Sequence, residues 1–206
     1  LNEQIDWEAF RPSLNVVHEK VRKSNAGAKP IDVVLIFKIL VLQQLHNLSD
    51  DRIEYQIRDR LSFMRFPGLQ MEGRVPDAKT VWLFRERLKE LKLVEVLFAQ
   101  FHEQLANRGY VARAGQMIDA TFVEVPRQRN SREENNLINA GQTPESWKQK
   151  PNKLRQKDRD ARWLKKNKTN FYGYKNHIKV DKDTKLINNW MVTPACDHDS
   201  QSLEPL

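Results

Sequence analysis

The chain has 206 residues, which is enough for one large domain or two smaller ones, and its formal net charge of +8 favours an anionic partner such as nucleic acid. The single cysteine, Cys196, excludes an internal disulfide and a cysteine-rich metal cluster. Residues 31–45 form the longest apolar stretch and are too short to span a bilayer, and no signal-peptide pattern opens the chain, so we expect a cytoplasmic protein without membrane contact.

The first half has the sequence pattern of a helical domain. Residues 31–46 are apolar on all sides, which predicts the buried centre of a helical bundle. Ser49 is placed to cap a second helix, and Asp77 or Thr80 a third. A last helix is expected over residues 93–107, ahead of a glycine that can adopt a left-handed conformation.

Two of these helices, around a short link, suggest a helix-turn-helix motif. In that arrangement the helix at residues 80–88 reads DNA, and Arg85 and Arg87 face the duplex. The alternative is a basic helix face that is simply solvated. Residues 1–112, the expected helical N-terminal domain, have a net charge of only +2, so the strong positive field lies elsewhere.

The second half, residues 113–206, contains the most basic segment of the chain. Residues 147–179 hold twelve lysines and arginines against two aspartates. Aromatic side chains lie among these charges and can stack on bases while the lysines pair with phosphates. The alternative for residues 142–158 is a disordered basic loop anchored by tryptophans.

Strand patterns surround this basic segment. Three strands are predicted, at residues 117–125, 171–180 and 186–192. A new helix follows, capped by Asp199 or Ser200. The predicted fold class is therefore α+β, with a helical N-terminal domain followed by an incomplete ribonuclease H-like α/β domain of three strands and the start of a helix. Residues 127–168, approximately, are expected to be a basic insertion within that domain.

Asp119 is the most informative single residue. It lies within QMIDATFVEVP at residues 116–126, a short apolar run rich in β-branched residues. An ionised group is costly to bury in such a strand, which suggests that the acid has a function. The alternative is an ordinary aspartate that faces solvent or accepts a local hydrogen bond.

Together these stretches resemble the DDE transposases of bacterial insertion sequences, in the branch with a helical N-terminal domain ahead of a ribonuclease H-like catalytic domain. The stretches that carry the resemblance are LSDDRIEYQIRDRLSFMRFPGL at 48–69, VPDAKTVWLFRERL at 75–88, IDATFVEVPRQ at 118–128, DARWLKKNKTNFYGYKNHIKVD at 160–181 and VTPACDHDSQ at 192–201. They occur in the family's order and at its spacing, and they span nearly the whole chain.

The resemblance implies that Asp119 is the first acid of a catalytic triad that holds Mg²⁺. The second aspartate and the glutamate belong to later parts of the family pattern, so we expect a chain truncated at its C-terminus. Asp199 matches a family position just before the second acid, where a helix cap is a better interpretation than a metal ligand.

The expected partner is DNA, as transposon ends and target, bound by a homo-oligomer without a small-molecule cofactor. The residues expected to hold phosphates are Arg162, Lys165, Lys166, Lys168 and Lys175.

The family function is a DNA transposase that cuts and joins phosphodiesters, although we expect this chain to bind DNA without strand transfer. One alternative is a catalytically inactive DNA-binding regulator made from a transposase. Another is an unproductive remnant whose sheet has unpaired edges. No RNA-recognition signature is present in the sequence.

Overall fold

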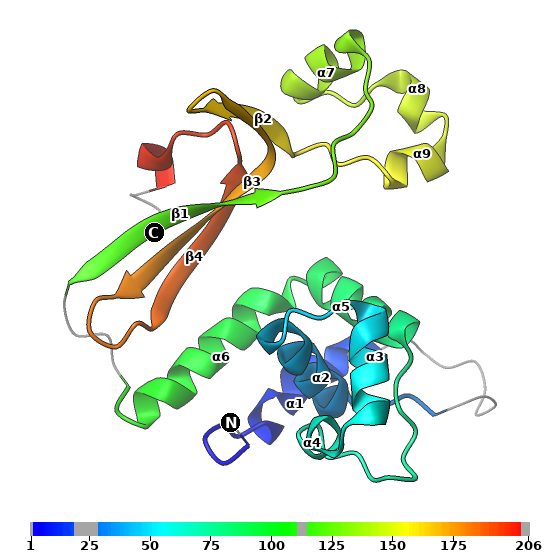
Figure 1. Cartoon of the computed structure of the whole chain (residues 1–206), viewed down its shortest axis with the longest axis vertical. Helices are drawn as coiled ribbons and strands as arrows, with labels where there is room; N and C mark the ends of the chain where they lie inside the picture. Colours follow the sequence, from blue (N-terminus) through cyan, green and yellow to red (C-terminus); the bar gives the residue numbers. More distant parts are fainter. Residues whose placement is uncertain (1, 19–28, 111–114, 203–206) are drawn as a thin grey trace. The chain divides into compact units, whose positions relative to one another are not determined.

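The computed structural model describes residues 2–18, 29–110 and 115–202 (Figure 1). The chain divides into two compact units, Leu1–Tyr110 and Val111–Leu206. Helices fill the first unit and an antiparallel sheet occupies the second, which confirms the predicted α+β class. Among the described residues, no helix has both the length and the apolar character needed to cross a membrane.

The first unit consists of short and medium helices. They are η1 (Glu8–Phe10), α1 (Arg11–Asn15), η2 (Val16–His18), α2 (Val33–Leu45), α3 (Asp50–Asp59), α4 (Leu61–Arg65), α5 (Ala78–Glu90) and α6 (Leu93–Asn107). The predicted caps are confirmed: Ser49 accepts a hydrogen bond from the Arg52 amide, and Asp77 accepts one from the Thr80 amide.

A continuous apolar core holds this unit together. The buried side chains run from Ile5 to Leu97 along the sequence, and Ile39 of α2 is completely buried. Helix α2 has buried residues at most of its positions, as its apolar composition predicts. Trp7 and Phe10 belong to this core, so the start of the chain is helical and packed.

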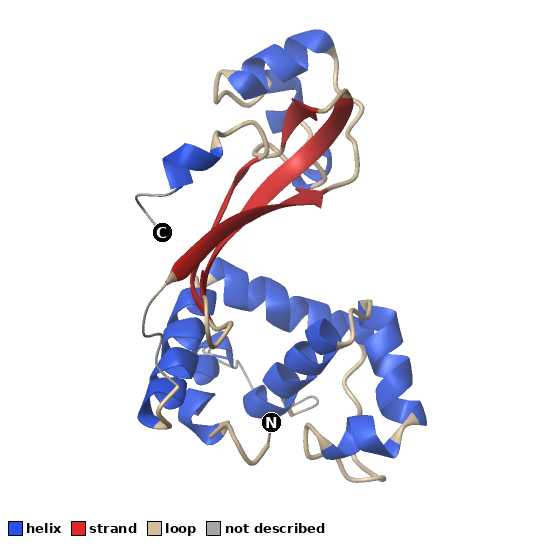
Figure 2. Ribbon diagram, turned by 60° about the vertical axis from the view of Figure 1, so that its left-hand side comes forward, coloured by secondary structure: helices blue, strands red, loops and turns tan. Residues whose placement is uncertain are grey.

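The second unit is built on a four-stranded antiparallel sheet (Figure 2). Its strands are β1 (Gln116–Glu124), β2 (Arg162–Lys166), β3 (Thr169–Asp181) and β4 (Ile187–Pro194). Strand β3 pairs with each of the other three. The three predicted strands are confirmed. The fourth, β2, lies where a basic loop was expected and forms a hairpin with β3.

Three short helices fill the insertion between β1 and β2: α7 (Arg132–Asn139), α8 (Glu145–Lys148) and α9 (Pro151–Arg155). Trp147 of α8 is completely buried, its Nε1 donates a 2.6 Å hydrogen bond to Glu134 of α7, and the ammonium of Lys153 in α9 lies 5.6 Å from its ring centre. The disordered-loop alternative is therefore wrong, because this tryptophan gives the insertion a small core of its own. The predicted end of the insertion, near residue 168, is also wrong, since residues 162–166 belong to the sheet.

Gly173 fixes the approach of β1 to β3. Its φ is +150°, and a Cβ atom at this position would lie 2.1 Å from the carbonyl oxygen of Val123. No side chain fits at that distance from a backbone atom, so only glycine allows these two strands to pair here.

Candidate functional site

Asp119 lies in the middle of β1, opposite Ile178 of β3. Its side chain is exposed, and Oδ1 accepts a 2.8 Å hydrogen bond from the backbone N–H of Ala120. The cost of burying this acid within an apolar strand therefore does not arise. The local geometry matches the simpler alternative, an aspartate that faces solvent and holds a neighbouring amide.

The backbone N–H of Ala120 points toward the edge of β1 that is not paired with β3. Hydrogen bonds from Lys182 N to Gly115 O and from Val125 N to Tyr172 O show that the odd-numbered residues of β1 direct their backbone groups at β3. Even-numbered residues therefore direct theirs away from β3. Within the described sheet β1 is an edge strand, so the Asp119 carboxylate occupies a backbone donor on the edge that faces away from β3.

The two faces of the sheet carry different chemistry. Side chains alternate along a strand and directly opposed residues share a face, so Asp119 lies on one face and Phe122 on the other. We call these the acid face and the Phe122 face. On the Phe122 face, the Phe122 ring stacks on Phe171 at 4.8 Å, and the ammonium groups of Lys166 and Lys175 lie 5.3 and 5.8 Å from its centre.

Lys175 and Asp199 form a pair on the Phe122 face. Lys175 is 5% exposed, and its ammonium donates to the Asp197 carbonyl at 2.5 Å and to Asp199 at 2.8 Å. The hydrogen bond from Lys175 lowers the pKa of Asp199. Asp119 and Asp199 therefore lie on opposite faces, and Lys175 could reach a phosphate only by leaving its present partners.

Asp199 caps no helix within the described residues. It is the first residue of a short 3-10 helix, η3 (Asp199–Ser202), rather than the residue before a helix. The backbone N–H of Ser200 donates instead to the His198 ring. The ion pair with Lys175 holds the Asp199 side chain. The helix that Asp199 or Ser200 was expected to cap would run into residues 203–206, which lie outside the described residues, so that cap stays a prediction.

Arg162 joins β2 to the insertion. Its guanidinium donates to the carbonyl oxygens of Arg159, Ala161 and Ile138 at 2.6 to 3.1 Å. These contacts use most of its donors, so the side chain supports the base of the hairpin. Its predicted contact with DNA stays a prediction.

The two arginines of α5 are also paired within their own unit. Arg85 forms an ion pair with Asp50, and Arg87 forms one with Glu90 at 3.0 Å. Helix α4 and residues 66–77 separate α3 from α5, so no short turn links those helices. The tight helix-turn-helix suggested by the sequence is therefore absent from α3–α5, and contact of these arginines with DNA stays a prediction.

The lysines near the hairpin turn are differently placed. Lys165, Lys166 and Lys168 are all exposed. Lys165 lies opposite Asn170 on the acid face, whereas Lys166 lies opposite Thr169 on the Phe122 face. These residues present three positive charges on both sides of one narrow ribbon.

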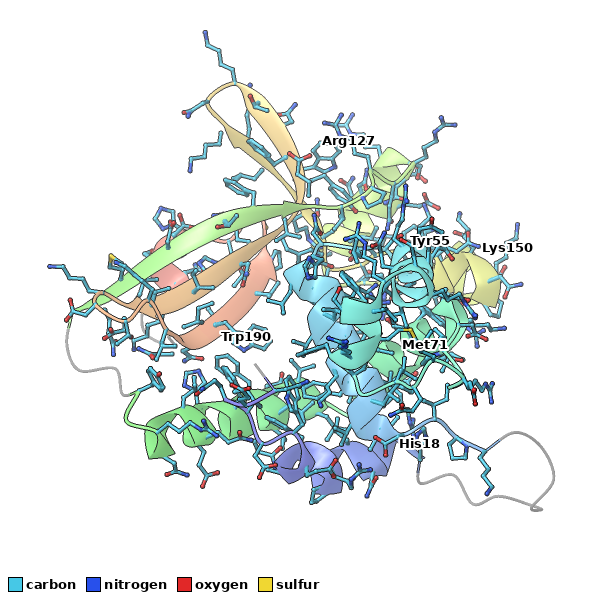
Figure 3. All side chains as sticks on the ribbon, turned by 60° about the horizontal axis from the view of Figure 1, so that its bottom comes forward. His18, Tyr55, Met71, Arg127, Lys150 and Trp190 are labelled. Carbon is cyan, nitrogen blue, oxygen red and sulfur yellow. The ribbon has the colours of Figure 1, made fainter. Side chains whose placement is uncertain are left out.

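Trp163, one of the aromatic residues in the basic segment that the sequence suggested could stack on bases, lies at the base of this ribbon. Trp163 is 48% exposed, and the guanidinium of Arg127, which Figure 3 labels, lies 5.4 Å from its ring centre. A strand pattern around the turn at Asn167 and Lys168 is the sequence signal that could have revealed the hairpin. The pair adds a stacking surface to the basic ribbon.

The described residues do not complete a metal site around Asp119. No group of three or more His, Cys, Asp or Glu side chains that could hold a metal occurs among them. Register places no second carboxylate on the strand positions of the acid face. Because two Mg²⁺ ions need several carboxylate oxygens, Asp119 alone does not provide a two-metal site.

Comparison with known families covers most of the chain. Residues 1–87 match the family described as Transposase domain (DUF772), and residues 112–206 match the Transposase DDE domain. No solved structure matched the chain. The order of the two domains is the order expected from the sequence, and the chain belongs to the DDE transposases of insertion sequences.

Proposed function

We propose that the chain acts on DNA in transposition and that Asp119 is one carboxylate of the catalytic site. The observation that supports this most is an exposed carboxylate in the middle of β1, within the residues that match the DDE domain. Because this carboxylate faces solvent, it would be accessible to a metal ion that also binds a DNA phosphate. A ribonuclease H-like order of β1, β3 and β4 agrees with this role.

The reaction requires hydrolysis of a phosphodiester and then attack of the freed 3′ hydroxyl on target DNA. Divalent metals, of which Mg²⁺ is the expected one, would supply charge stabilisation for both steps. Two further carboxylates must join Asp119 to hold such ions. We therefore propose that the described residues bind DNA without cutting it.

DNA binding is assigned to the exposed lysines of the β2–β3 hairpin, Lys165, Lys166 and Lys168. Lys175 and Arg162 are less suitable because their side chains already have protein partners. The DNA partners would be transposon ends and target, bound by a homo-oligomer in the cytoplasm.

A plasmid assay tests this function. The wild-type chain and Asp119→Asn are incubated with supercoiled plasmid and Mg²⁺, and both binding and nicking are measured. We expect equal binding by the two proteins and nicking by neither. Metal-dependent nicking that Asp119→Asn abolishes would show that the chain completes the site, and failure to bind any DNA would overturn the transposase proposal.

A second candidate function is a DNA-binding regulator of transposition. Asp119 has no second carboxylate on the described strand positions of the acid face, and this, together with the exposed lysines of the hairpin, favours it. A regulator would reduce transposition when expressed beside an active transposase of the same element, and Asp119→Asn would reduce it equally. A loss of inhibition in Asp119→Asn would argue against this candidate.

A further inference from the structure

We propose that the β2–β3 hairpin is a two-stranded ribbon that enters the major groove of duplex DNA. This inference rests on the proposed function, because it requires that the chain bind DNA. It adds which element makes the contact and which surface of the duplex it meets.

The end of the hairpin has the shape required. Lys166 pairs with Thr169, so the turn consists only of Asn167 and Lys168, whose φ angles are +50° and +67°. Two positive φ values are typical of a type I′ turn, which keeps a hairpin narrow and twisted. The ladder between β1 and β3 ends at Gly173, and one further hydrogen bond joins Val125 N to Tyr172 O, so residues 169–171 are paired with β2 alone among the described strands. Such a two-stranded ribbon fits the major groove, which is about 12 Å wide.

The chemistry of the turn matches DNA. Residues 165–170, KKNKTN, are all exposed and contain three lysines, two asparagines and a threonine without any acid. Lysines on both sides of the ribbon can pair with the phosphates that border a groove. The Asn170 amide lies beside Lys165 on one face, and asparagine can form two hydrogen bonds to adenine in the major groove.

The base of the ribbon is held firmly. Arg162 binds three carbonyl oxygens there, and Gly173 allows the close approach of β1. The Trp163 and Tyr172 rings lie 5.1 Å apart across the two strands. A ribbon that is ordered before binding loses less conformational entropy when it enters a groove.

The experiment uses one mixed-sequence duplex in two forms. One form has ordinary cytosine and the other has glucosylated 5-hydroxymethylcytosine, whose sugar fills the major groove and leaves the phosphates and the minor groove open. Three full-length proteins are compared by fluorescence anisotropy. They are the wild type, the hairpin variant Lys165→Gln/Lys166→Gln/Lys168→Gln, and the charge-matched control Lys150→Gln/Lys182→Gln/Lys185→Gln, whose three lysines are exposed elsewhere (Figure 3 labels Lys150).

We expect the wild type and the control to bind the ordinary duplex at least about tenfold more tightly than the glucosylated one. The hairpin variant should bind both forms weakly and equally. Its slope of log K against log salt should be smaller by about two to three, one unit for each lost phosphate contact. Asn170→Ala should keep the wild-type salt slope and the preference for the ordinary duplex, because the sugar excludes the ribbon by its size, and it should bind the ordinary duplex more weakly if the amide contacts adenine.

Two results would overturn the inference while leaving DNA binding intact. In one, the wild type binds both duplexes equally. In the other, the hairpin variant discriminates between them as well as the wild type does. If the wild type binds neither duplex, the proposed function and this inference both fail.

Discussion

The two units of the chain achieve stability by different means. In the first, buried apolar side chains from Ile5 to Leu97 form one continuous core. In the second, the described buried apolar residues are few: Ile138, Trp147, Ala161, Tyr172 and Ala195. The sheet therefore depends on strand register, on one obligatory glycine and on specific polar contacts. This leaves its faces open for partners.

Strand β1 shows the consequence most clearly. Met117, Ile118 and Val123 are each more than one third exposed although they are large and apolar. A strand with apolar side chains and one unpaired edge is a template for further pairing. By accepting the Ala120 amide, Asp119 occupies one of the donors on that edge. The Asp119 carboxylate is thus placed both to hinder pairing of a further strand with this edge and to bind a ligand from solvent.

The largest expected effect follows from breaking the sheet at Gly173. The Cβ of Gly173→Ala would collide with the Val123 carbonyl, so we expect the second unit to lose more than about 3 kcal/mol of stability while the helical unit keeps its own. NMR spectra would show loss of the β1 and β3 signals. Gly141→Ala is the control, because that glycine also has positive φ but no atom near its Cβ position. Equal effects of the two substitutions would contradict the close-approach argument.

A substitution in the apolar core of the helices should destabilise the first unit and leave the second unit unchanged. Ile39 is completely buried, so Ile39→Ala should cost about 2–5 kcal/mol in the unfolding of the helices. Leu45→Ala in the same helix removes a side chain that is 59% exposed and should cost less than about 0.5 kcal/mol. Urea unfolding followed by helical circular dichroism measures both. Loss of the sheet signals in Ile39→Ala would show that the units are not independent.

The insertion should respond to acid through Glu134. The backbone N–H of Ser131, followed by Trp147 and Lys153, lowers the pKa of this carboxyl to about 2. A lowered pKa stabilises the fold above the ordinary value of 4.5, and this contribution is lost as the pH falls toward 2. Glu134→Gln should therefore cost about 1–2 kcal/mol at neutral pH and reduce the acid sensitivity of the insertion.

Fluorine NMR of 5-fluorotryptophan at position 147 measures this change directly, since that ring is buried against Glu134. The exposed neighbour Glu133 provides the control substitution Glu133→Gln. An identical pH dependence in wild type and Glu134→Gln would mean that the Glu134 contact does not stabilise the insertion.

The smallest effect on stability is expected at Asp119. Asparagine can still accept the Ala120 amide, and the side chain is exposed, so Asp119→Asn should leave the urea midpoint of the second unit unchanged. A clear loss of stability would make Asp119 a structural residue and would remove the main reason for assigning it a catalytic role.

The sequence predicts features that depend on local interactions. Ser49 and Asp77 identify helix starts because a cap is formed within a few residues. Strand β2 was missed because its turn uses Asn167 and Lys168 rather than the usual asparagine and glycine. Helices α7 to α9 were missed because each is short and depends on Trp147, which meets Glu134 only after folding.

In the candidate site, too, the features that depend on contacts between distant residues could not be predicted from the sequence. The motif around Asp119 identifies the acid, but its exposure follows from the position of β1 at the edge of the described sheet. Lys175 and Asp119 lie on opposite faces because of strand register, which depends on long-range pairing. The close approach at Gly173 also depends on that pairing.

Amide hydrogen exchange along β1 tests most directly whether Asp119 lies on an exposed edge strand. We predict protection of Met117, Asp119, Thr121 and Val123, whose amides face β3, and rapid exchange of Ile118, Phe122 and Glu124, whose amides face away. Ala120 should exchange at an intermediate rate that increases when Asp119→Ala removes its acceptor. Uniform protection along β1 would contradict the open edge, because it would mean that a further strand is paired there.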